Sequence, residues 1–307
     1  SDCFMKNCYG RFDQLCREAG LRWHSESGGP WKHDRLLFRE ADQLAFWGRN
    51  AMPQCEFWVP TSRYRSNARR TAMSAHVYGK RLVSVEAFTH MQNHWSQFPA
   101  LLKRPADMAL CDGVNQFIWH TSTASPEEFG LPGIVYFAGT HVNRNVTWYD
   151  YSRGFFDYLG RCQAMLRRGH FVADVCCYTS DKNCAVWTRA REWSEKASLH
   201  LPAGYSYDLL NSEVLTQRVH VDGNGDLVLP DGMRYRVLIV DLEEDIMPIE
   251  ALRQVVALVE AGATVVLGER APTRSPGINN HPAATEELKT LSAKLWGSSV
   301  TTRKLGK

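Results

Sequence analysis

The stretch YRVLIVDLEEDIMPIEALRQVVALVEAGATVVL, residues 235–267, decides the fold class of this 307-residue chain. It opens with an apolar run at Tyr235–Val240, which has the length of a buried strand. The apolar positions of Ile249–Glu260 recur at helical spacing, and Gly262 ends that helix before a second apolar run at Ala263–Leu267. A strand, a helix and a strand in this order predict a βαβ unit with parallel strands. We therefore expect an α/β fold with a small doubly wound domain.

Two absences limit what this domain could do. No Gly-x-Gly-x-x-Gly sequence lies between its first strand and its helix, so a dinucleotide site is not supported. No cysteine follows Cys184, which excludes a thiol nucleophile in this region. We expect the domain, placed at residues 201–307, to be structural or to form an interface.

Upstream of this unit, short apolar runs alternate with helical patterns over the first 175 residues. Such alternation predicts further β/α units and a parallel sheet. The pattern predicts helices at 12–19, 34–50, 66–79, 94–102 and 151–168, and strands at 21–24, 54–59, 82–85, 116–120 and 171–175. If the last run closes a (β/α)8 TIM-type barrel, these are about strands 4–8. We therefore expect residues 1–200 to form the C-terminal part of a catalytic barrel whose first strands are absent.

Three glutamates accompany the predicted strands at intervals of 30 residues. Glu26 follows the first strand, Glu56 lies within the second, and Glu86 ends the third. Barrels carry their chemistry at the carboxyl ends of the strands, and glycoside hydrolysis needs two carboxyl groups across the scissile bond. The sequence favours Glu26 and Glu86 as this pair, with Glu56 as a third member. Solvated carboxylates, or carboxylates that bind backbone N–H groups, are the alternative.

The segment GTHVNRNVTW, residues 139–148, is dense in groups that could bind a sugar. Its candidates are His141, Asn143, Arg144 and Trp148, because polar donors suit hydroxyls and an indole offers a flat apolar face. An ordinary surface loop is the alternative. The other candidate substrate-binding residues flank predicted strands, where turns or core-edge histidines are equally compatible: His24, Trp58, Asn115 and His120.

Composition excludes several other classes of function. The chain has 36 basic and 33 acidic residues, a net charge of +3, and no basic run, so nucleic-acid binding is not supported. Its nine cysteines are irregularly spaced without a Cys-x-x-Cys pair, which argues against a zinc ribbon and a disulfide framework. No apolar stretch approaches the ~20 residues that span a bilayer.

Taken in order, several of these stretches resemble glycoside hydrolase family 106, and the resemblance covers roughly residues 5–300. The stretches are HSESGGPW (24–31), EFW (56–58), EAFT (86–89), DGVN (112–115) with His120, GTH through Trp148 (139–148), ADV (173–175) and GYSYD (204–208). Members of this family are much longer than this chain. The resemblance therefore implies a fragment that holds the second half of the barrel and the following amidotransferase-like α/β domain.

The resemblance also implies an activity, which we state as an expectation. It implies removal of terminal α-L-rhamnose from plant polysaccharides or glycosides, with inversion by Glu26 and Glu86, and a calcium ion whose ligands the sequence does not reveal. A parent protein in the bacterial periplasm or outside the cell would suit that role. Two alternatives stay open: a retaining galactosidase-like enzyme, and a non-catalytic sugar-binding or assembly module.

Overall fold

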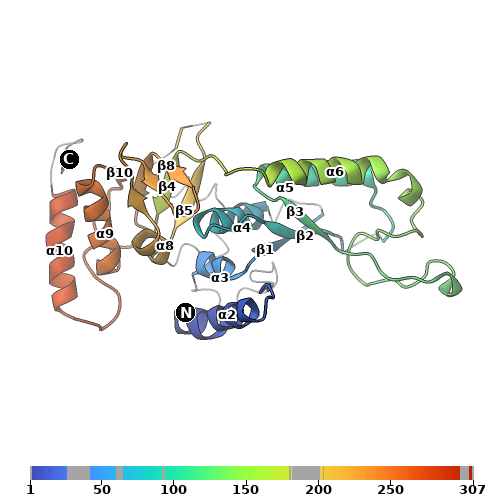
Figure 1. Cartoon of the computed structure of the whole chain (residues 1–307), viewed down its shortest axis with the longest axis horizontal. Coiled ribbons are helices and arrows are strands. Elements are labelled where there is room, and N and C mark those ends of the chain that lie inside the picture. Colours follow the sequence, from blue (N-terminus) through green and yellow to red (C-terminus); the bar gives the residue numbers. More distant parts are fainter. Residues whose placement is uncertain are drawn as a thin grey trace.

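The computed structural model describes residues 2–25, 42–59, 65–91, 94–179, 181, 201–202, 204–297 and 304–305. Within these residues, two parallel sheets and their helices form the α/β fold that the sequence predicts. The two sheets lie side by side along the long axis of the molecule, with the helical α2 region below the helices that join them (Figure 1).

The first sheet, called sheet A, has three parallel strands in the order β1-β2-β3. Each strand follows from a short apolar run, and the helices that connect the strands cover one face of the sheet (Figure 1). The strands are β1 (Gln54–Trp58), β2 (Ser84–Thr89) and β3 (Gln116–Trp119), and the helices are α4 (Arg65–Val77), α5 (Pro99–Cys111) and α6 (Arg153–Leu166).

The second sheet, called sheet B, has four parallel strands in the order β10-β9-β4-β5. Its unit β9-α9-β10 confirms the βαβ prediction, and α10 packs on the outer side of α9 (Figure 1). The elements are β4 (Val175–Tyr178), β5 (Tyr207–Leu210), α8 (Ser212–Gln217), β9 (Val237–Val240), α9 (Ile249–Glu260), β10 (Thr264–Leu267) and α10 (Ala283–Trp296).

Helix α4 joins the two sheets because it has apolar side chains on two sides. Ala72 and Ala75 are fully buried in the cluster that covers sheet A. Met73 packs instead with Val175 and Ile239 on sheet B. The small alanine side chains allow the helix to approach sheet A closely, so α4 forms part of the core on both sides.

Two of the five strands that we expected in the barrel are placed differently. Residues 21–25 form no strand, and the carbonyl of Trp23 accepts a hydrogen bond from Ala51 N at 2.9 Å. The run expected at 171–175 begins only at Val175 and continues to Tyr178 as β4, which pairs with β5 and β9. All four residues of β4 are buried, as in a central strand covered on both faces. Sheet B therefore includes residues that precede the domain boundary predicted at residue 200.

The remaining elements refine the predicted pattern. Helix α5 begins at Pro99, a residue favoured in the first helical turn, and continues beyond the predicted end at Leu102. Residues 222–226 join β6 to β7 in a small antiparallel sheet, to which β8 adds a third strand. The other short elements are α1 (Asp2–Phe4), η1 (Met5–Tyr9), α2 (Gly10–Glu18), α3 (Gln43–Arg49), η4 (Glu127–Phe129), η5 (Tyr149–Tyr151), β6 (His220–Val221), β7 (Leu227–Val228) and β8 (Arg234–Tyr235). Among the helices of the described residues, none combines the length and apolar character needed to cross a membrane.

Candidate active site

Sheet A has an apolar face and a polar face. Side chains alternate along a strand, and Cys55, Phe57 and Val85 belong to the apolar cluster under the helices. Glu56 and Glu86 occupy the intervening positions and therefore project from the opposite face. We call that opposite face the polar face of sheet A.

Glu56 and Glu86 are neighbours on this face because they are directly paired in the register of β1 and β2. Neighbouring strands lie about 4.8 Å apart, so the two carboxylates start from adjacent backbone positions. Glu56 is fully buried, and the indole Nε1 of Trp58 donates a hydrogen bond to its Oε2 at 2.7 Å. Its burial and this hydrogen bond restrict the Glu56 carboxylate to one orientation.

Glu86 is the more accessible carboxylate, with a side chain that is 22% exposed. Its Oε1 lies 3.8 Å from Nδ1 of His120, and the same nitrogen lies 3.1 Å from the hydroxyl of Thr89. His120 follows the last residue of β3, so it lies at a carboxyl strand end as predicted. The cluster of Glu86, Thr89 and His120 combines a group able to give or take a proton with two groups able to bind hydroxyls.

The position of Glu86 corrects one detail of the sequence analysis. We expected this glutamate at the end of its strand, whereas β2 continues to Thr89. Thr89 extends the pairing because it aligns with Trp58 and its carbonyl accepts from Val59 N at 2.8 Å. Thr89 was not among the predicted site residues, although its place directly after an apolar run was a usable signal.

Hydrogen bonds hold the loop after β3 against the end of β2, beside His120. Thr140 N donates to the carbonyl of His120 at 2.9 Å, and the Thr140 hydroxyl donates to the carbonyl of Phe88 at 2.5 Å. Gly139 allows this approach: its φ is +105°, and a Cβ there would lie 2.7 Å from the His120 carbonyl oxygen. A larger residue at Gly139 would push the loop away from the site.

His141 belongs to an aromatic group next to this loop. Its Nε2 lies 2.6 Å from Nδ1 of His94, and its ring packs on Trp95 with centroids 4.2 Å apart. Burial, and then the neighbouring His94, lower the pKa of His141. His141 is thus held neutral and oriented within the protein. His94 and Trp95 were missed because their contact with His141 spans 46 or more residues of sequence.

Three other predicted binding residues bind the protein itself. Arg144 donates to the carbonyl of Ser125 at 2.8 Å and pairs with Glu127 at 3.0 Å. Asn143 donates to the Thr123 hydroxyl at 3.3 Å. These contacts hold residues 123–127. Trp148 belongs to a separate contact: its Nε1 donates to the carbonyl of Gln97 at 2.8 Å.

The structure places Asn115 away from the carboxyl strand ends that carry His120. It precedes β3, at the amino edge of sheet A, and its side chain binds Val83 N at 2.8 Å and the carbonyl of Arg81 at 3.0 Å. It connects two strand starts and lies far along the strands from His120. His24 is exposed, and Glu26 lies outside the described residues.

The implied calcium ion can be tested against the side chains present. Calcium takes six to eight oxygen ligands, mostly carboxylates and carbonyls. Within the described ranges, no three His, Cys, Asp or Glu side chains come together so that they could hold a metal ion. The described part of the site does not fit calcium by itself.

The α/β fold and the paired carboxylates on the polar face define a candidate carbohydrate-cleaving enzyme, and comparison with known proteins identifies the family. The model of glycoside hydrolase family 106, described as alpha-L-rhamnosidase, matches residues 1–307. The chain belongs to this family.

Two relatives support the assignment. A rhamnosidase from Novosphingobium sp. PP1Y superposes with a TM-score of 0.83 at 27% identity, covering 97% of this chain and 28% of its own length. A protein of Formosa agariphila named "Putative beta-glucuronidase" is 32% identical over 305 residues, which are 97% of this chain and 24% of that protein. The chain therefore spans about a quarter of the length of these relatives.

Proposed function

We propose that the full-length protein containing this chain hydrolyses terminal α-L-rhamnosides of plant polysaccharides or glycosides, and that the polar face of sheet A lines its active site. The observation that carries this proposal is the cluster of Glu86, Thr89 and His120 at the carboxyl side of the sheet. In this proposal, sheet A is one part of a (β/α)8 barrel that the rest of the protein completes, and sheet B is the core of an amidotransferase-like domain.

Glu86 is the proposed acid or base, and Glu26 is its proposed partner. An inverting enzyme needs carboxyls about 6.5–9.5 Å apart, with room for a water between the second carboxylate and the sugar. Glu56 is less suited to that role because it is fully buried and bound by Trp58. We assign Glu56 to positioning on the floor of the site. Protonation of the leaving oxygen and activation of water are then divided between Glu26 and Glu86.

His120 and Thr89 would act through hydrogen bonds. The Thr89 hydroxyl lies 3.1 Å from Nδ1 of His120 and orients the ring, and an imidazole in this position would form a hydrogen bond with a sugar hydroxyl. Tyr136 packs edge-on against His120 with centroids 5.4 Å apart and is partly exposed. It offers an aromatic surface beside the sugar.

A β-glucuronidase activity is the second candidate, favoured by the name of the Formosa agariphila relative. The two candidates differ in the charge and the anomeric configuration of the sugar. The full-length protein should be assayed on 4-nitrophenyl α-L-rhamnoside, β-D-glucuronide and β-D-galactoside, with the configuration of the first product followed by proton NMR. Rhamnoside turnover with inverted product supports the proposal, and turnover of the glucuronide alone replaces it with the second candidate.

Calcium binding and a periplasmic or extracellular location stay proposals for the longer protein. A calcium ion would require ligands beyond the described cluster. Chelation with EDTA should then lower rhamnoside turnover, and added calcium should restore it. Unchanged turnover after complete removal of calcium, verified by atomic absorption, would remove the ion from the proposal.

A further inference from the structure

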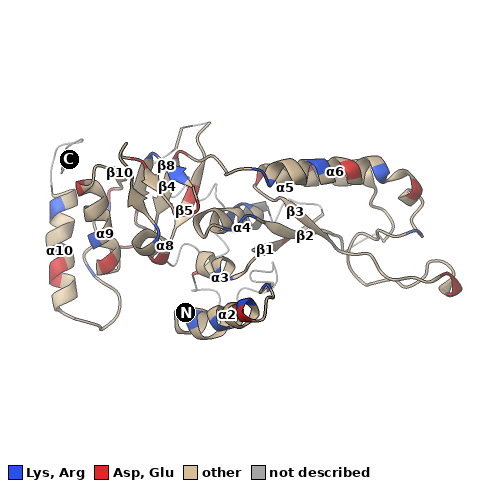
Figure 2. Cartoon of the chain, in the orientation of Figure 1, with Lys and Arg blue, Asp and Glu red and all other residues tan. Residues whose placement is uncertain are grey.

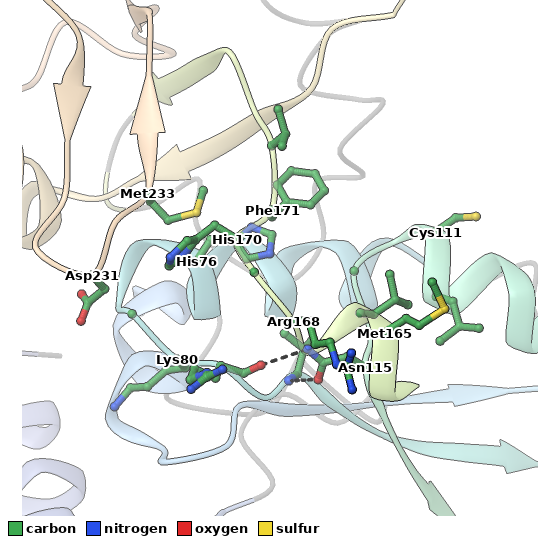
Figure 3. A pocket seen from close by; sticks show the side chains of 18 residues that line it. His76, Lys80, Cys111, Asn115, Met165, Arg168, His170, Phe171, Asp231 and Met233 are labelled. Atoms are coloured by element: carbon green, nitrogen blue, oxygen red, sulfur yellow. Dashed lines mark hydrogen bonds between the residues drawn. The ribbon is translucent and has the colours of Figure 1, made fainter. Parts of the chain in front are cut away.

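A large hollow lies at the amino edge of sheet A, opposite the edge that bears His120. It has a volume of about 820 Å³ and is formed where the turn after α4, the end of α6 and the start of sheet B meet (Figure 3). Lys80, Arg168 and His170 are among the side chains that line it, with Phe171 and Met165 as apolar neighbours (Figure 3).

A second hollow of about 450 Å³ shares Gly79, Lys80 and Arg81 with the first. It adds Arg22 and Arg167 to the lining. The two hollows therefore meet at the turn between α4 and β2, and we call them together the double hollow.

Cations outnumber carboxylates around this double hollow. Within the part of the chain that the structure describes, Lys80, Arg81 and Arg168 form no ion pair. Among the described residues that line the hollows, the one acidic residue is Asp231, which pairs with Arg218. The outer helices α9 and α10 differ, since they carry both signs (Figure 2) and pair them, as in Arg253 with Glu287.

Lys80 lines both hollows and is partly buried. Its pKa is lowered, first by partial burial and then by the positive charges of Arg17, Arg218 and Arg49, which the carboxylate of Asp231 offsets only in part. An anion bound beside Lys80 would oppose this shift, because an opposite charge favours the protonated amine.

We propose that this double hollow binds an acidic saccharide, through carboxylate or sulfate groups on its sugars, at a site separate from the catalytic face. Arginine guanidinium groups match the geometry of carboxylate and sulfate oxygens. The hollow is much wider than a single acidic side chain, and its apolar side chains suit the faces of sugar rings. This proposal rests on the proposed function only in that the protein acts on glycans. The site would bind an acidic region of the polysaccharide that carries the rhamnose.

The test uses the full-length protein and tetragalacturonate as the probe, with binding measured by isothermal titration calorimetry. The variant Lys80→Gln/Arg81→Gln/Arg168→Gln should weaken binding by at least about tenfold, because three cationic contacts are lost. The matched control Arg11→Gln/Arg104→Gln/Arg161→Gln removes the same charge from exposed positions elsewhere and should change binding less than about twofold. Single Arg81→Gln and Arg168→Gln variants repeat the measurement with less disturbance of the fold.

Three results separate this site from the proposed activity. Glu86→Gln should lower rhamnoside turnover by about 10²–10⁴-fold and leave tetragalacturonate binding unchanged. The cationic triple variant should keep turnover of the uncharged 4-nitrophenyl rhamnoside. Inorganic sulfate at equal concentration should not displace the probe, since a lone anion lacks the sugar contacts. The proposal is overturned if the full-length protein does not bind tetragalacturonate, as when an acidic segment of its own fills the hollow, or if the triple variant and the control bind equally.

Discussion

Sheet A and sheet B are built from similar short parallel strands, yet they differ in what lies on their second face. Sheet A buries one face under α4 and α5 and carries Glu56 and Glu86 on the other. Sheet B has α4 on one side and α8 and α9 on the other, so β4 is buried along its whole length.

This difference implies that sheet A contributes mainly to catalysis and sheet B mainly to the stability of the fold. A sheet that is apolar on both faces gains free energy from burial but offers no polar group to a substrate. A sheet with one polar face gives up part of that burial and presents carboxylates and hydroxyls at fixed spacing. Changes on the polar face of sheet A should therefore affect turnover, and changes inside sheet B should affect unfolding.

The largest expected effect is on catalysis at Glu86. We expect Glu86→Gln to lower turnover of an aryl α-L-rhamnoside by about 10²–10⁴-fold, because the amide cannot exchange a proton. The unfolding free energy should change by less than about 0.5 kcal/mol, since the shape is kept. The control is Glu127→Gln, an 89% exposed carboxylate paired with Arg144, which should leave turnover unchanged. Equal losses in the two variants would contradict the role of Glu86.

The corresponding change in sheet B is Leu238→Ala. Leu238 lies at the centre of β9 and is fully buried, so its truncation should cost about 2–5 kcal/mol of stability. Turnover per folded molecule should stay the same. Calorimetric unfolding and a titration of active sites measure the two quantities. Val266→Ala on the partly exposed edge strand β10 should cost less than about 1 kcal/mol, and a similar cost at both positions would be evidence against a buried sheet B.

A smaller effect is expected at Thr89, because its side chain only orients the His120 ring. Thr89→Val removes the hydroxyl that lies 3.1 Å from His120 Nδ1 and should lower kcat/KM by about tenfold. Thr89→Ser keeps the hydroxyl and should restore most of the rate. If the valine and serine variants have the same kcat/KM, Thr89 does not position His120.

A pH dependence of stability is expected at Asp42, which caps α3 by accepting from Ala45 N. Burial, and then the charge of Asp181, raise the pKa of Asp42 to about 8. Since the folded pKa lies above the ordinary value of 3.8, this stabilising contribution is complete below pH 3.8 and is lost as the pH rises through about 8. Between about pH 5 and pH 9, Asp42→Asn should therefore lose less stability than the wild type, as measured by urea unfolding. Parallel curves for the two proteins would show that Asp42 does not titrate in this range.

Much of the fold was predictable because its signals are local. The βαβ unit at 235–267 combines two apolar runs, an amphipathic helix and a glycine stop, and the structure places β9, α9 and β10 there. The sheet to which a strand belongs is not determined by local sequence signals. The run at 171–178 has no feature that distinguishes a last barrel strand from the central strand of sheet B, and only its pairing with β5 and β9 decides this.

The site was predictable only in part for the same reason. The rule that chemistry lies at carboxyl strand ends predicted where His120 and Glu86 lie along their strands, and their roles stay predictions. It could not reveal that Asn143 and Arg144 bind residues 123–127, because those contacts depend on the path of a long loop. Asn115 lies at the amino end of β3, where its side-chain oxygen accepts a hydrogen bond from Val83 N just before β2.

The most direct test of the account is a crystal structure of the full-length Glu86→Gln variant soaked with an aryl α-L-rhamnoside. The account predicts a rhamnose ring on the polar face of sheet A, within hydrogen-bond distance of residue 86 and of His120. A rhamnose ring bound elsewhere, with the polar face covered by other parts of the protein, would contradict it.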